Sequence, residues 1–85
     1  MPKIIDVSSE QDQLTAATNA VLDAVEYHRV YKEVPPDLVI RTSDPNVKKA
    51  GEGGFGPQIG TPIATLRSNM AYLLAIGVSV TFDQM

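Results

Sequence analysis

The chain of 85 residues contains no cysteine and no tryptophan, and its one histidine is His28. Without cysteine it can form neither a disulfide bridge nor a thiolate metal site, which are common supports of small domains. A single histidine also excludes a metal cluster built on several histidines of one chain. A domain this short buries only about 60% of its unfolded surface. We therefore expect a modest core that gains stability from oligomerisation or from docking onto something larger.

Positive charge is scarce as well. Seven lysines and arginines stand against ten acidic residues, which gives a net charge of −3. The basic residues are scattered, whereas a surface that follows phosphates needs a cluster of them. We therefore predict no nucleic-acid binding. The densest basic group, Lys48 and Lys49 with Arg41, is interpreted as a solvated turn, with contact to a phosphate or an acidic partner as the alternative.

Long hydrophobic runs are also missing. The longest apolar stretch, residues 71–78, is far shorter than the roughly 20 residues that span a bilayer. The amino-terminal residues lack the apolar run of a secretory signal. We expect no membrane association, and a soluble protein of the cytoplasm or of a particle assembled there, such as a virion.

The clearest positive signal is a helix over residues 62–76. Thr61 can cap free backbone N–H groups of the first turn, and Pro62 suits the first helical position. Gly77 stands where a left-handed residue commonly ends a helix. The apolar residues between them recur at helical spacing and predict one buried face: Ile63, Leu66, Met70, Leu73 and Leu74.

A second helical pattern covers residues 9–33. Ser8 and Gln11 have the spacing of a capping box, and Pro35 and Pro36 stop the pattern. The residues that recur at spacings of three and four are Leu14, Ala17, Val21, Ala24, His28 and Tyr31. Such a helix is about 36 Å long at 1.5 Å per residue, which exceeds the diameter of so small a domain. We expect part of it to project or to pack against a neighbour.

Three short segments alternate or are rich in branched residues, as strands do: residues 3–7, 37–42 and 78–82. We expect the first to lie at an edge. Residues 43–50 form either a turn or a single helical turn capped by Asp44. The sequence predicts one α+β domain over residues 1–85, with two helices packed on a sheet of two or three strands.

Residues 51–60 are predicted to form a flexible glycine-rich loop. Gly51, Gly53 and Gly56 match the string G-x-G-x-x-G. A dinucleotide site, however, needs a strand directly before these glycines and an acidic residue about 20 positions later. Neither is present, so nucleotide or small-ligand binding is the weakest of three functional hypotheses. Alternatively, Phe55 anchors the loop in a neighbour's pocket, or it folds back over its own core.

The sequence offers no catalytic constellation, no cofactor site and no metal site. His28 beside Glu26 and Arg29 is interpreted as a structural or surface residue rather than a general base. The acidic residues of the long helix, Asp23 and Glu26, resemble a solvated face. Apolar residues near its end spread more widely than one stripe and suggest a second contact surface. Together with the loop aromatic they give the candidate interface residues: Tyr27, Val30, Tyr31 and Phe55.

The function that we expect is therefore structural and not enzymatic. The leading hypothesis is an accessory subunit that self-associates or joins a scaffold within a larger symmetric assembly. Compact, cysteine-free, mildly acidic chains of this size are typical of accessory proteins of tailed-phage particles, such as capsid decoration or head-fibre subunits, although no motif assigns this chain to a family. The alternative is a monomeric regulatory or inhibitory module that binds one partner protein.

Overall fold

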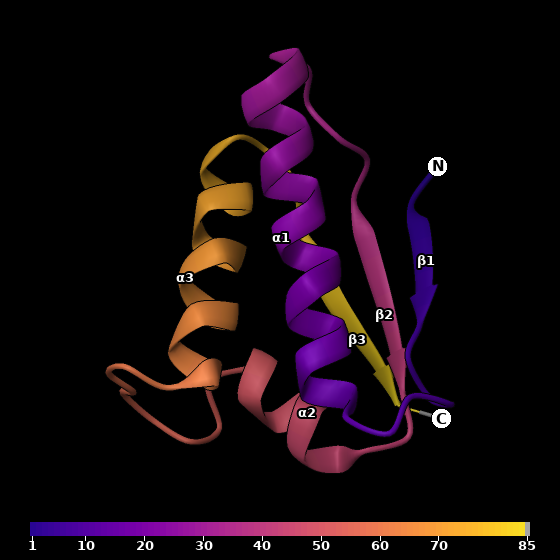
Figure 1. Cartoon of the computed structure of the whole chain (residues 1–85), viewed down its shortest axis with the longest axis vertical. Coiled ribbons are helices and arrows are strands. Elements are labelled where there is room, and N and C mark those ends of the chain that lie inside the picture. The colour runs from indigo at the N-terminus through magenta and orange to yellow at the C-terminus, as the bar shows by residue number, and fades with distance from the viewer. Residues whose placement is uncertain (85) are drawn as a thin grey trace.

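The computed structural model describes residues 1–84, which form a small α+β domain (Figure 1). The predicted fold class is confirmed. The elements follow in the order β1 (Lys3–Asp6), α1 (Gln13–Tyr31), β2 (Leu38–Thr42), α2 (Pro45–Gly51), α3 (Pro62–Ala75) and β3 (Val80–Gln84).

The three strands are all parallel and lie in the order β1-β2-β3, so β1 is an edge strand as expected. Helical crossovers make this pairing possible, since parallel neighbours cannot be joined by a tight turn. α1 connects β1 to β2, and α2 with α3 connects β2 to β3. In Figure 1 α1 lies in front of β3, and α3 lies beside α1, which it contacts.

The core lies between the helices and one face of the sheet. Along β2 the side chains of Leu38, Ile40 and Thr42 are buried, and those of Val39 and Arg41 are only partly covered. Successive residues of a strand point to opposite faces. The buried set therefore faces the helices, and the other set faces away from them.

α1 is shorter than predicted, because it begins at Gln13 rather than near residue 9. Asp12 caps it by accepting a hydrogen bond from the Thr15 backbone N–H at 3.0 Å. The expected capping box at Ser8 is wrong, since the Ser8 hydroxyl donates instead to Asp6 at 2.5 Å. The helix ends at Tyr31, and Lys32 follows in the left-handed conformation with φ 58°. Its 19 residues span about 28 Å, within the 32 Å long axis of the molecule, so the predicted excess length disappears.

The prediction of two helices omits α2. Of the two alternatives for residues 43–50, the helical one is correct: Asp44 accepts from the Asn46 N–H at 2.9 Å, and Pro45 opens the helix. Gly51 ends this helix instead of opening the loop. A Cβ at Gly51 would stand 2.1 Å from Cε1 of Phe82 on β3, so the close approach of α2 to the sheet requires glycine there.

The bounds of α3 match their prediction to within one residue, but its buried face is narrower than predicted, since Leu66 and Leu73 are buried whereas Leu74 is 68% exposed. The Thr61 hydroxyl accepts from the Ala64 N–H at 3.1 Å. At the other end Gly77 has φ 91°, and the Val78 N–H bonds to the Leu73 carbonyl at 2.8 Å. This is the Schellman arrangement, in which the residue after the glycine turns back onto the last helical turn. Because Val78 is used in that turn, β3 begins at Val80, two residues later than predicted.

Candidate functional site

A groove of about 810 Å³ lies between α1 and the edge strand β1, and we call it the α1–β1 groove. Its walls are one flank of α1 and the helix-facing side of β1, and the segment before β2 closes one end. The apolar floor of the groove is formed by Ile5, Val7, Ala16, Ala20, Ala24 and Leu38.

Small side chains on α1 keep this groove open. Ala16, Ala20 and Ala24 follow each other at intervals of four, so they lie on one flank of the helix. Each offers only a methyl group toward Ile5 of β1, which is itself only partly buried. The sheet also ends at β1, so no fourth strand within residues 1–84 fills the space beside it.

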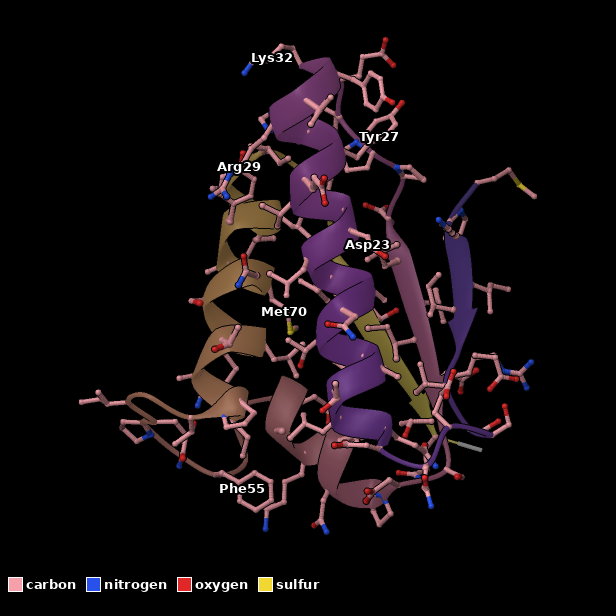
Figure 2. The ribbon with its side chains drawn as sticks, in the orientation of Figure 1. Asp23, Tyr27, Arg29, Lys32, Phe55 and Met70 are labelled. Atoms are coloured by element: carbon pink, nitrogen blue, oxygen red, sulfur yellow. The ribbon has the colours of Figure 1, made fainter. Side chains whose placement is uncertain are left out.

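Four acidic residues line the groove, and we call them the acidic rim: Asp6, Glu10, Asp12 and Asp23. The side chain of Asp6 is on the other face of β1, in register with Arg41, so Asp6 borders the groove at the edge of the strand. Lys3 is the only lysine or arginine in the groove lining. Figure 2 shows Asp23 and Tyr27 on the flank of α1 that faces β2 and β1. The lining is therefore apolar at its base and negatively charged around it.

Local hydrogen bonds keep two members of the rim ionised. The hydroxyl and the backbone N–H of Ser8 both donate to Asp6 and hold the pKa of that carboxyl below its ordinary value of 3.8. The backbone N–H and then the hydroxyl of Thr15 do the same to the pKa of Asp12. Hydrogen bonds that favour the charged form of a carboxyl lower its pKa.

A second uncovered surface is the sheet face turned away from the helices, which we call the bare face. The strand register gives it one row of Ile4, Val39 and Thr81. The next row is Asp6, Arg41 and Asp83.

Both rows of the bare face are accessible. Ile4 is 62% exposed, although it is apolar. In the charged row the side chains of Arg41 and Asp83 are 41% and 61% exposed. Arg41 lies between two acids, and its Nε, which is itself buried without a hydrogen bond, is 3.9 Å from the Oδ2 of Asp83.

The structure separates the predicted interface residues into two regions. Tyr27, Val30 and Tyr31 are exposed at the end of α1, and the two tyrosine rings have centroids 5.0 Å apart. Phe55 lies at the opposite end of the molecule (Figure 2). Its ring is 38% exposed, and the Lys49 ammonium lies 4.8 Å from the ring centroid. Only Tyr27 of this set lines the groove.

His28 joins the two long helices. Its Nδ1 lies 2.7 Å from the Tyr72 hydroxyl, and the two rings meet edge to face. The Arg29 guanidinium lies 5.1 Å from the centroid of the same tyrosine ring. These contacts fasten α1 to α3, and they agree with the interpretation of His28 as a structural residue.

The carboxyl ends of the strands, where ligands of open α/β sheets often bind, are occupied by a polar network that connects elements of the chain itself. Gln13 accepts from the Thr42 hydroxyl at 2.6 Å and from the Ser43 backbone N–H at 3.0 Å. Its amide also donates to the Ser43 hydroxyl at 2.8 Å. These groups satisfy one another, so the network holds α1 against the turn after β2.

The glycine-rich loop does not have the context of a phosphate-binding loop. The element before Gly51 is the helix α2, whereas the fingerprint needs a strand there. The guanidinium of Arg67 donates to the Gly56 carbonyl, which ties the loop to α3. The one salt bridge of the Lys48 and Lys49 pair is internal to its own turn, between Lys48 and Glu52 at 2.9 Å.

Residues 1–84 contain neither a metal-ligand cluster nor a membrane-spanning helix. No group of three or more potential metal-ligating acids or histidines lies close enough to hold an ion. None of the helices in this range is long and apolar enough to cross a membrane. Comparison of the chain with protein-family models, with curated proteins and with solved structures finds no match.

The sequence analysis missed the α1–β1 groove and the bare face. It interpreted Asp23 as part of a solvated face and did not include Glu10 or Asp12 among the candidate residues. The sequence does contain one signal that could have indicated the groove. Ala16 and Ala20 are four residues apart on α1 and stand between an acidic residue and Asp23. That signal becomes a groove only when β1 is known to be the edge neighbour of this flank.

Proposed function

We propose that the protein is a non-enzymatic accessory subunit of a larger symmetric assembly, and that a second copy covers its bare face. The observation that supports this proposal is the one-sided sheet. All-parallel sheets occur almost only with both faces covered. Here the face with Ile4 and Val39 has no covering element within residues 1–84, so an intermolecular contact would complete the usual arrangement.

The bare face is suited to a contact with itself. A two-fold axis parallel to the strands would place the row of Ile4, Val39 and Thr81 opposite the same row of the second copy. The charged row would likewise lie opposite the charged row of the second copy. In such an isologous interface each patch must complement itself. Stacked sheets are rotated by about 30° relative to each other. This rotation would shift each Arg41 away from the Arg41 of the second copy and toward a carboxylate of the charged row.

The size of the bare face sets the strength of this contact. Three strands about 4.8 Å apart present a patch of only about 200 Å². A stable interface needs about 800 Å² from each partner. The contact would therefore be weak in isolation and effective where each subunit is held by several contacts at once, as in a phage particle or another closed shell.

Sedimentation velocity tests the proposal over a range from about 10 μM to about 1 mM. We expect a concentration-dependent dimer or larger closed oligomer that Ile4→Lys abolishes. Leu74→Lys is the matched control, because Leu74 is an exposed apolar residue on α3, away from the sheet face. A chain that stays monomeric throughout, or an oligomer that Ile4→Lys leaves intact, would overturn the assignment to the bare face.

The second candidate function is a monomeric regulatory or inhibitory module. The observation that favours it is the α1–β1 groove, whose acidic rim is suited to a partner of opposite charge rather than to a second copy. Monomeric behaviour in the same sedimentation series, combined with tight capture of one partner, would favour this function over the first.

A further inference from the structure

We propose that the α1–β1 groove binds an extended, basic segment of a partner protein, which pairs with β1 as a fourth strand of the sheet. This inference does not depend on self-association through the bare face, because the groove lies on the helix-facing side of β1. It rests on three properties of the groove: a free strand edge, an apolar floor and a net negative lining.

The free edge is the outer side of β1. The Lys3 N–H bonds to the Asp37 carbonyl at 2.7 Å, and the Val7 N–H bonds to the Arg41 carbonyl at 2.9 Å. Backbone groups alternate in direction along a strand, so the N–H and C=O groups of Ile4 and Asp6 point away from β2. Such an edge is a template for strand addition, in which main-chain hydrogen bonds supply affinity.

The apolar floor can accept alternate side chains of an added strand. Every second residue of that strand would point to the helix side, toward Ile5, Ala16 and Ala20. The wall from Asp12 to Tyr27 is about 22 Å long at 1.5 Å per residue, and this length matches six or seven extended residues.

Charge identifies the partner. The acidic rim has four carboxylates, and Lys3 is the one basic residue of the lining, so two copies of the groove would repel each other. A segment with lysine or arginine at the two ends of its helix-facing side, and apolar residues between them on that side, would place its cations near Glu10 and Asp23 and its apolar side chains on the floor. Complementary charge of this kind steers association and rejects wrong partners.

The probe is a synthetic heptapeptide, blocked at both ends, whose helix-facing positions are lysine or arginine at the two ends and valine between them, with threonine at the other positions. Titrated into the ¹⁵N-labelled full chain, it should bind with a Kd of about 100 μM or tighter and weaken as salt rises. Exchange of the Ile4 and Asp6 amide hydrogens should slow on binding, because these groups would become paired. A matched peptide with glutamate at the basic positions should not bind.

Two charge reversals on α1 locate the contact. Asp23→Lys should weaken binding of the basic peptide by roughly fivefold, the scale expected for a partly screened ion pair that becomes a repulsion. Glu26→Lys is the control on the same helix, since Glu26 is exposed and outside the groove lining; it should change the Kd less than twofold by the same reasoning. Far-ultraviolet circular dichroism should show that both variants fold.

Three results would overturn the proposal. The first is no binding at about 1 mM peptide. The second is equal weakening by Asp23→Lys and Glu26→Lys, which would indicate general attraction to an acidic protein. The third is binding that leaves exchange at Ile4 and Asp6 unchanged, because this would show that the occupant is not an added strand. Tighter binding of a basic helical peptide would lead to the same conclusion. Monomeric sedimentation, by contrast, would contradict only the contact through the bare face.

Discussion

The two flanks of α1 are both apolar, yet one is closed and the other is open. On the closed flank, which faces α3 and the middle of the sheet, Val21 and Val25 are almost completely buried. On the open flank, which faces β1, Ala16 and Ala20 line a groove. The difference lies in what covers each flank: α3 packs against the closed flank, whereas the sheet ends at β1 beside the open one. A helix can therefore use one flank to hold the fold together and leave the other available for a partner.

The largest expected effect comes from removing volume on the closed side. Leu66 of α3 has no exposed surface, so Leu66→Ala should lower the free energy of unfolding by about 3 kcal/mol. That is a large part of the total for a domain of this size, since native domains are stable by roughly 0.1 kcal/mol per residue. Urea denaturation monitored by circular dichroism measures the change.

The matched change on the open side is Ile5→Ala, because Ile5 is only partly buried beside the groove. It should cost about 1 kcal/mol, since part of its surface is already in water. Equal losses for the two variants would contradict the distinction between the flanks.

The next effect concerns the close packing of α2 on the sheet. Gly51→Ala would place a Cβ within 2.1 Å of the Phe82 ring, so we expect a loss of about 2 kcal/mol from forced repacking. Phe82→Leu removes the ring atoms that clash. The double variant should therefore lose less stability than the sum of the two single variants. Simple additivity in denaturation experiments would show that the ring is not the obstacle.

A pair of identical substitutions on α1 compares its flanks directly. Ala17 has no exposed surface, so Ala17→Leu should overpack the core and cost about 2 kcal/mol. Ala20 lines the groove, so Ala20→Leu has room and should stay within about 0.5 kcal/mol of the parent. Leucine and alanine are both good helix formers, which makes the two variants comparable. Similar losses in thermal denaturation would contradict an open flank at Ala20.

The same Ala20→Leu variant tests the groove as a binding site. A leucine there reduces the space above the floor, so the basic heptapeptide should bind more weakly although the fold is intact. The amide-exchange titration measures this. Unchanged peptide affinity would place the binding surface elsewhere.

The sequence predicts elements well where start and stop signals are local. Thr61, Pro62 and Gly77 define α3 because each acts through backbone groups within five residues of itself. The start of α1 is harder, since Ser8 and Asp12 are both good caps. The Ser8 hydroxyl is already bonded to Asp6, and this leaves the cap to Asp12. Composition alone does not rank such competing bonds.

The candidate surfaces could not be predicted because they depend on the order of the strands. Asp6 and Asp23 stand 17 positions apart, and they share a groove only because β1 is an edge strand beside one flank of α1. The bare face likewise requires that both crossovers pass over the same side of the sheet. The exposure of Tyr27 and Tyr31 agrees with their selection as interface candidates, and their role there stays a prediction.

The smallest expected effect is the response of the open flank to acid. The pKa of Asp6 is lowered first by the Ser8 hydroxyl, and the pKa of Asp12 first by the Thr15 backbone N–H. A carboxyl whose folded pKa is depressed stabilises the fold above its unfolded value of 3.8, and this contribution is lost as pH falls through the folded pKa. We therefore expect the free energy of unfolding to decrease below about pH 4.

Two substitutions, each of which removes one hydroxyl, distinguish the contributions of Asp6 and Asp12 to stability. Ser8→Ala removes the largest cause of the Asp6 shift, so the stability difference from the parent should be greatest above about pH 4 and should shrink as the pH falls through the folded pKa of Asp6, below which this carboxyl is protonated in both proteins. Thr15→Val leaves the Thr15 backbone N–H, which is the larger cause of the lowered pKa of Asp12. The pH-dependent part of its stability loss should therefore be smaller than that of Ser8→Ala. Urea titrations repeated across this pH range measure both. A pH-independent difference for Ser8→Ala would show that the Ser8 hydroxyl stabilises the turn without acting through the charge of Asp6. Asp12 would then be the one member of the acidic rim whose charge a local hydrogen bond stabilises.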